Sequence, residues 1–105
     1  MESERRREQR YSFVAAAEVT VSESNVSLKA RTSDLSSNGC YLDTVNPLPQ
    51  GAVVTVHIKH GDRTFVAQGV VAHVQLNMGM GVTFIALESG CSALLESWLG
   101  ETNLE

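Results

Sequence analysis

Hydrophobic and polar residues alternate along most of the chain, and this pattern predicts a β-rich domain. Positions 18–22 switch between polar and apolar at every residue, which is typical of a half-buried strand, expected here over residues 11–22. A second strand is expected over residues 25–32, with Val26, Leu28 and Ala30 on one face. Four more β-rich runs follow, at residues 40–45, 53–59, 64–74 and 80–87.

The segments between these runs carry turn residues. Asn38-Gly39 is a strong signal for a tight turn between two strands. Residues 46–51 hold two prolines and a glycine, which favours a loop. Residues 60–63 and 76–79 are expected to turn the chain between strands. Gly69 interrupts the run at 64–74 and indicates a bulge or a bend.

The last segment changes to a helical period. Ser89 or Ser92 is expected to cap the start of a helix, and Gly100 is expected at its end. The apolar positions with this spacing are Cys91, Leu94, Leu95, Trp98 and Leu99, which form one face of an amphipathic helix. Five to seven antiparallel strands followed by one helix predict a small barrel or roll, with the helix covering an opening or an edge.

Composition is consistent with one small domain. The chain has 105 residues, of which 43% are hydrophobic and 19% charged, as in globular proteins. No apolar run approaches the roughly 18 residues that cross a membrane, and the N-terminus is charged rather than signal-like. We therefore expect a cytoplasmic protein without membrane insertion. Cys40 and Cys91 are expected to be buried free thiols rather than a disulfide framework.

Charge is distributed unevenly. The net charge of −4 argues against a general nucleic-acid binder, because phosphate contacts dominate that affinity. Residues 1–10 hold four arginines against three glutamates, a balance of +1, whereas the other 95 residues hold four basic and nine acidic side chains, a balance of −5. Residues 1–10 also lack apolar periodicity. They predict a basic, flexible arm that contacts an anion.

The sequence offers little for catalysis. His57 and His60 lie three apart in a predicted strand, so they tend to face opposite sides and are poorly placed to share a metal. The motifs HExxH, CxxC and G-x-S-x-G do not occur. Gly79-Met80-Gly81 is too short for a phosphate-binding loop and precedes a strand rather than a helix. We expect a protein that is not an enzyme and has neither a metal nor a cofactor.

Two segments carry complementary binding chemistry. The first holds Arg6 and Arg10, four residues apart, with Arg5 and Arg7 alongside. Guanidinium groups bind phosphate oxygens and the Hoogsteen edge of guanine in a bidentate manner, and they stack on bases. An arginine run of this kind, taken alone, is usually a solvated tail.

The second segment is Asp34-Leu35-Ser36-Ser37-Asn38-Gly39. Asp34 can accept hydrogen bonds from the N1–H and amino group of guanine, and Ser36 can donate or accept. Gly39 allows either a close backbone approach or a positive φ. Taken alone, the hexapeptide favours a simple turn, which we expect to present Asp34 and Ser36 outward. Together, the two segments favour a purine nucleotide ligand.

The spacing Arg6-x-x-x-Arg10 followed by Asp34-x-Ser36-x-x-Gly39 resembles the paired signature of PilZ domains, bacterial receptors for the second messenger cyclic di-GMP. Residues 68–71 and 79–84 also look like PilZ strands, so the resemblance covers about residues 5–99. It implies a six-stranded antiparallel β-barrel with a C-terminal helix at one end. The arm at 1–10 would close over the ligand on a barrel domain at 11–100, followed by a tail at 101–105.

The resemblance also implies roles for individual residues. Arg6 and Arg10 would contact phosphates and guanine faces. Asp34 and Ser36 would bind a guanine edge, and Gly39 would leave room for the ligand.

The resemblance leaves the roles of two further residues open. A basic residue at Arg5 fits family members that bind an intercalated pair of ligand molecules rather than one. His73 stands where certain members carry a tryptophan that stacks on a base, and it is either a weaker stacking residue or an ordinary surface residue.

The function that the resemblance implies is a receptor that binds cyclic di-GMP and passes the signal to a downstream protein that the sequence does not identify. Two alternatives stay open. One is a PilZ-fold interaction module that does not depend on nucleotide. The other is a weak binder of single-stranded nucleic acid, which the charge of −5 on the barrel opposes.

Overall fold

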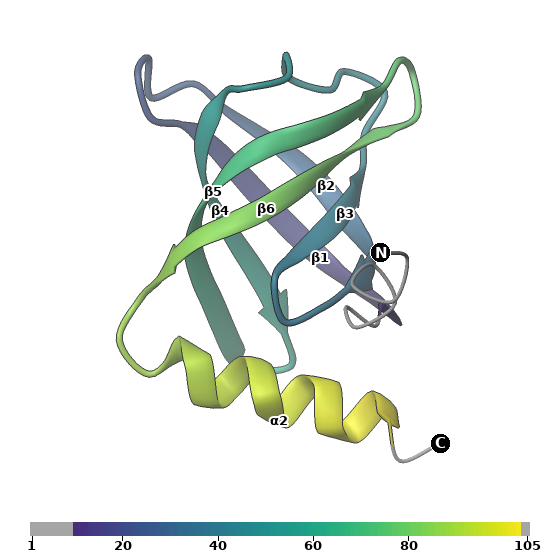
Figure 1. Ribbon diagram of the computed structural model, residues 1–105, viewed down its shortest axis with the longest axis vertical. Helices are drawn as coiled ribbons and strands as arrows, with labels where there is room; N and C mark the ends of the chain where they lie inside the picture. Colours follow the sequence, from purple (N-terminus) through teal and green to yellow (C-terminus); the bar gives the residue numbers. More distant parts are fainter. Residues whose placement is uncertain (1–9, 104–105) are drawn as a thin grey trace, which may run out of the picture.

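The computed structural model describes residues 10–103, which form a closed six-stranded antiparallel barrel with one helix across an end (Figure 1). The order around the barrel is β1-β2-β3-β6-β5-β4, and β1 pairs with β4 to close it. The strands are β1 (Tyr11–Val21), β2 (Ser27–Leu35), β3 (Gly39–Asp43), β4 (Val53–His60), β5 (Arg63–Gln75) and β6 (Gly79–Leu87), followed by the helix α2 (Cys91–Asn103). The predicted mainly-β barrel with a C-terminal helix is confirmed. The arm predicted at 1–10 lies outside the described residues, apart from Arg10.

Buried and more exposed side chains alternate strictly along the strands β1 and β4 of the barrel wall. β1 buries every second side chain from Phe13 to Val19, and β4 does the same from Val54 to Ile58. Side chains on the inner face of a closed barrel meet at its centre and fill it, so these positions form the core. The prediction for the second strand was partly wrong. β2 begins at Ser27, and Val26 lies before it with 57% of its surface exposed.

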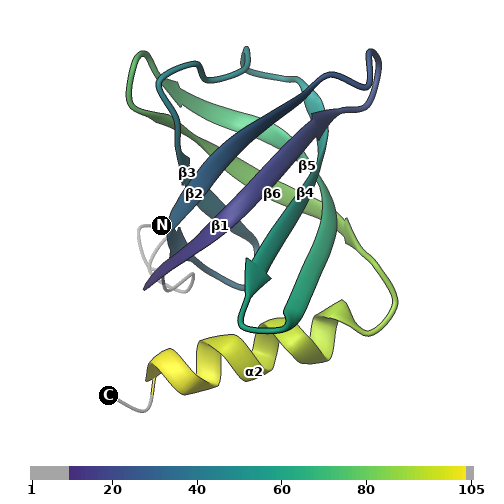
Figure 2. The ribbon, with the colours of Figure 1, turned by 180° about the vertical axis from the view of Figure 1, so that it is seen from behind.

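The helix closes one end of the barrel with an aromatic cluster. Views from both sides show α2 lying across that end (Figures 1 and 2). Its buried Trp98 stacks on Phe13 of β1, with ring centroids 5.2 Å apart, and lies 6.1 Å from the ring of Phe65 in β5. His60 packs edge-on against Trp98 at 5.5 Å. Because aromatic pairs add about 0.5–1.5 kcal/mol each beyond area burial, the cluster anchors the helix to the barrel.

The ends of α2 differ from the predicted ones. The backbone N–H of Leu94 bonds to the carbonyl of Gly90, so Gly90, rather than Ser89 or Ser92, occupies the N-cap. Glycine is acceptable there because it adopts non-helical angles without strain. The helix also continues through Gly100 to Asn103, since one interior glycine costs only about 1 kcal/mol relative to alanine.

The connections follow the sequence pattern. His60 pairs with Arg63 across a two-residue hairpin in which Gly61 has φ 65°. The pairing of β5 with β6 shifts register between Gln68 and Gly69, which confirms the predicted irregularity. Cys40 and Cys91 are free and buried, as expected. Among residues 10–103, no helix is long and apolar enough to cross a membrane.

Replacing Trp98 with alanine should lower the free energy of unfolding by about 3–5 kcal/mol, because a large buried ring is lost from the closed end. The adjacent, exposed Ser97→Ala is the matched control and should change it by less than about 0.5 kcal/mol. Urea denaturation followed by circular dichroism measures both. Equal stability of the two variants would show that the helix does not close the core.

Candidate functional site

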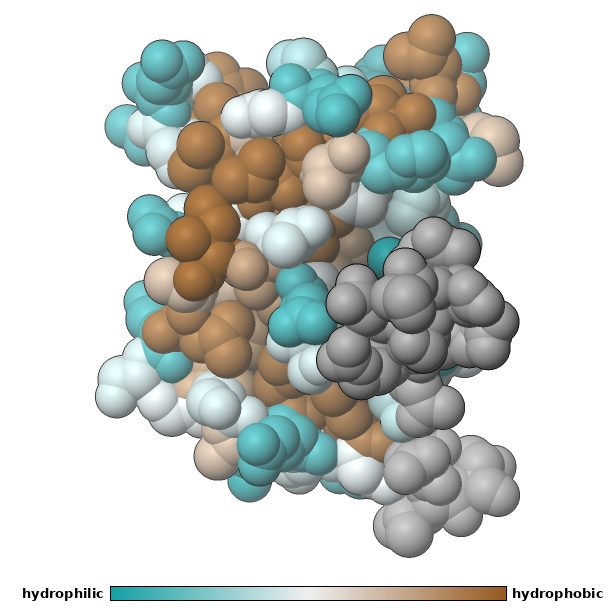
Figure 3. All heavy atoms as spheres, viewed as in Figure 1, coloured by the Kyte–Doolittle hydropathy of each residue, from teal (hydrophilic) through white to brown (hydrophobic). Residues whose placement is uncertain are grey.

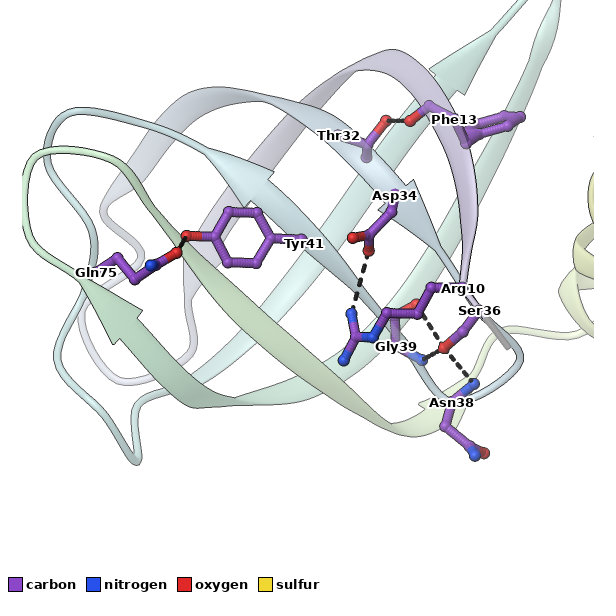
Figure 4. A network of polar contacts seen from close by, with 9 residues as sticks. All are labelled: Arg10, Phe13, Thr32, Asp34, Ser36, Asn38, Gly39, Tyr41 and Gln75. Atoms are coloured by element: carbon purple, nitrogen blue, oxygen red, sulfur yellow. Dashed lines mark hydrogen bonds and ion pairs between the residues drawn. The ribbon is translucent and has the colours of Figure 1, made fainter. Parts of the chain in front are cut away.

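The loop between β2 and β3 is held by the side chain of Ser36. This side chain is fully buried, and its hydroxyl oxygen accepts hydrogen bonds from the backbone N–H groups of Asn38 (3.2 Å) and Gly39 (3.1 Å) (Figure 4). The backbone N–H of Ser36 also donates to the Gly39 carbonyl at 2.8 Å. A serine hydroxyl commonly fixes tight turns in this way. The predicted chain reversal is confirmed, but the expectation that Ser36 faces outward was wrong.

Gly39 permits a close approach between two strands. It is buried at the start of β3, where it pairs with Thr83 of β6. A Cβ atom at this position would collide with the carbonyl oxygen of Val82. Its φ lies outside the left-handed region, so, of the two reasons that the sequence offered for this glycine, the close approach applies.

Asp34 faces outward because strand pairing changes register beside it. β2 turns every second side chain inward as far as Thr32, which is fully buried. Continued alternation would point Asp34 into the core. The β2–β3 pairing shifts between Thr32 and Asp34, and the β1–β2 pairing shifts nearby. The Thr32 hydroxyl donates to the Phe13 carbonyl at 2.6 Å, which satisfies a backbone acceptor at this irregularity. Such irregularities commonly re-aim a side chain.

Arg10 meets Asp34 at the outer surface. The distance from Arg10 Nη1 to Asp34 Oδ1 is 3.1 Å, and the two side chains are 53% and 30% exposed. An exposed ion pair contributes at most about 1 kcal/mol, so another charged partner can displace it at low cost. The structure therefore brings together Arg10 and Asp34, one described residue from each predicted motif. Arg5 and Arg6 lie outside the described residues.

Strand register places His73 in line with Asp34. Asp34 pairs with Tyr41 of β3, Tyr41 pairs with Gly81 of β6, and Gly81 pairs with His73 of β5. Paired residues share one face of a sheet, and neighbouring strands lie about 4.8 Å apart. These four residues therefore form an outer row, Asp34–Tyr41–Gly81–His73, which runs across four strands. We call it the outer row below.

Tyr41 is the member of this row that sequence reasoning missed. Its hydroxyl hydrogen-bonds to Gln75 Oε1 on β5 (Figure 4). Burial, together with the carboxylates of Asp43 and Asp34, raises the pKa of Tyr41 above its ordinary value. Its place between the apolar Cys40 and Leu42, both buried in the structure, was a usable signal, because alternation makes it face outward.

The described residues offer little reactive chemistry. Burial raises the pKa of the Cys40 thiol to about 12, with Asp34 adding to the shift and Arg10 opposing it. The thiol is therefore protonated and serves packing rather than nucleophilic attack. Within residues 10–103, no group of three or more His, Cys, Asp or Glu side chains is arranged to hold a metal ion.

The family model for the PilZ domain matches residues 4–101. A comparison with curated protein sequences finds no match.

Solved structures share the fold at low sequence identity. The PilZ domain of YcgR from Escherichia coli, with c-di-GMP, has a TM-score of 0.78 and 17% identity, covering 95% of this chain and 92% of that one. The PilZ domain of CeSA from a cellulose-synthesizing bacterium has a TM-score of 0.71 and 13% identity, covering 90% and 98%. The Bacillus subtilis inhibitor of motility MotI/DgrA has a TM-score of 0.76 and 13% identity, covering 92% of this chain and 50% of that one. This chain thus spans half the length of MotI/DgrA.

Substituting Gly39 with alanine should destabilise the protein by about 1–3 kcal/mol, because β3 must move away from the Val82 carbonyl. The control is Gly100→Ala, where a Cβ meets no atom within 4 Å. That change should raise stability by up to about 1 kcal/mol, because alanine favours a helix over glycine. Thermal unfolding of both variants tests the assignment, and a Gly39→Ala protein as stable as wild type would contradict it.

Proposed function

The chain belongs to the PilZ domain family, and we propose that it is a receptor for cyclic di-GMP that binds its ligand on the outer face of the barrel at Arg10 and Asp34. The observation that supports the site most directly is the contact between these two side chains. They come from segments 24 residues apart, yet they meet on an exposed surface. The PilZ domain of YcgR, which shares the fold, was solved with c-di-GMP.

The chemistry of the two side chains fits this ligand. Cyclic di-GMP is a dianion with two guanines, and each guanine carries adjacent N1–H and amino donors on one edge. Asp34 is an acceptor-only carboxylate that can take both donors, and the Arg10 guanidinium can bind phosphate oxygens or stack on a base. In the proposed exchange, ligand binding breaks the ion pair. Arg10 then engages the nucleotide phosphate or base, and Asp34 engages the guanine edge.

Four other predicted site residues have supporting roles in this proposal: Arg5, Arg6, Ser36 and Gly39. Arg5 and Arg6 add positive charge beside Arg10 and neutralise phosphates, whether one ligand molecule or an intercalated pair is bound. Ser36 acts through the loop that its hydroxyl holds together, and this loop sets the position of Asp34. Gly39 acts through the close strand approach that it allows.

We propose that the protein carries the signal as a cytoplasmic adaptor rather than by catalysis. The bound nucleotide and the arginine segment together would form a surface that the free protein lacks, and a downstream protein would bind that surface. Ligand-dependent surfaces of this kind convert a local charge change into a binding event.

One observation favours a second candidate, a nucleotide-independent interaction module. Hydrophobic side chains gather near the end of the β5–β6 hairpin (Figure 3). Leu76, Met78 and Val45 are 78%, 63% and 67% exposed there, and a Thr44 N–H to Met78 carbonyl bond holds their segments together. Exposed apolar clusters often mark protein contacts. This candidate predicts no binding of cyclic di-GMP to the wild type.

Arg10→Ala and Asp34→Ala should each weaken binding of cyclic di-GMP by about 10- to 150-fold, because each removes a charge-assisted contact worth about 1.5–3 kcal/mol. Isothermal titration calorimetry gives the affinity and the stoichiometry. Arg63→Ala, at the β4–β5 hairpin, is the matched control and should bind like wild type. Binding by folded Arg10→Ala and Asp34→Ala proteins with unchanged affinity would reject the proposed site.

A further inference from the structure

We propose that Tyr41 is a fixed platform on which one guanine of the ligand stacks, with Gln75 and Gly79 as its positioning residues. This inference rests on the proposed function and adds to it a residue that neither binding motif contains. Three features of the structure support it: the place of Tyr41 in the outer row, the contacts that fix its ring, and the glycine beside it in that row.

The first feature is the place of Tyr41. It is the direct cross-strand partner of Asp34, so the two side chains rise from neighbouring strands on the same face. A guanine whose edge is bound by Asp34 would extend from β2 over the neighbouring strand β3, which carries Tyr41. Figure 4 shows both side chains on the same side of the barrel wall. A base held at its edge by a carboxylate still needs a surface for its face, and an aromatic ring provides one.

The second feature is the fixed position of the ring. Its hydroxyl bonds to Gln75 on β5, so the side chain of Tyr41 reaches across β6. Beneath it lies Gly79, where a Cβ atom would stand 2.7 Å from Cε2 and 3.0 Å from the hydroxyl oxygen. The same Cβ atom would collide with the Leu42 carbonyl oxygen, so the glycine allows both the close approach of β3 and β6 and the position of the ring. Ordering the ring before the ligand arrives avoids a cost of about 0.5–1.5 kcal/mol for immobilising a side chain on binding.

The third feature is the glycine beside the ring. Gly81 lies between Tyr41 and His73 in the outer row, and a Cβ atom there would lie 3.8 Å from Tyr41 Cδ1 and 3.5 Å from His73 Cβ. These are ordinary van der Waals contacts, so Tyr41 and His73 flank the position closely. Because Gly81 has no side chain, none stands between the two rings along the outer row. Stacking of a base on an aromatic side chain contributes about 1–3 kcal/mol.

Calorimetric titration of cyclic di-GMP into Tyr41 and Gln75 variants tests the platform. Tyr41→Ala should weaken binding by about 5- to 150-fold, which corresponds to the loss of one stacked base. Tyr41→Phe keeps the ring and should stay within about threefold of wild type. Gln75→Ala should weaken binding by about as much as Tyr41→Phe in the wild-type background and by no more in the Tyr41→Phe background, because both changes remove the same hydrogen bond. Arg63→Ala, at the β4–β5 hairpin, is again the control and should bind like wild type.

Aromatic NMR resonances of wild-type Tyr41 give a second readout that does not depend on the stability of a variant. Stacking on guanine should move them upfield as cyclic di-GMP is added. If wild type binds but folded Tyr41→Ala binds within twofold of it, or the Tyr41 ring resonances stay in place, the platform is overturned and the proposed function stands. If wild type shows no binding of cyclic di-GMP, the proposed function fails and the platform fails with it.

Discussion

Thr32 and Asp34 lie two residues apart in β2, yet Thr32 is fully buried and Asp34 faces the surface beside Arg10. The change of strand pairing between them is the constraint on which the candidate site depends. It keeps an uncompensated carboxylate out of an apolar core, where its burial would cost several kcal/mol. The Thr32 hydroxyl stabilises this arrangement through its bond to the Phe13 carbonyl. The same strand therefore contributes Thr32 to the core and exposes Asp34, the proposed binding group.

The candidate site combines a firmly held loop with an ion pair whose two side chains can easily change partners. The buried hydroxyl of Ser36 and the close strand approach at Gly39 hold the loop after Asp34. Above them, Arg10 and Asp34 form an exposed pair that contributes little to stability. The proposed receptor function needs both properties, because the loop must keep its shape while the charged groups change partners. Under that proposal, Asp34 contacts the ligand, whereas Ser36 and Gly39 hold the loop that carries it.

Local patterns predicted the fold well, because alternation and helical spacing are properties of neighbouring residues. They located the strands β1 and β4 and the face of α2 that carries Trp98. Patterns failed at two positions for different reasons. Ser36 turns inward because the backbone of its own loop binds its hydroxyl, a turn geometry that residue type alone does not decide. Tyr41 matters because three separate pairings align it with Asp34 and His73, and cross-strand register is not visible in one strand.

The central claim is that the surface around Arg10 and Asp34 binds cyclic di-GMP. Titration of the isotopically labelled wild-type protein with cyclic di-GMP, followed by backbone amide NMR, tests it most directly. The account predicts saturable shifts at Arg10, at Asp34 and along residues 36–39, with little change in α2, at the closed end of the barrel. An absence of shifts, or shifts confined to α2 and the β4–β5 hairpin, would contradict it.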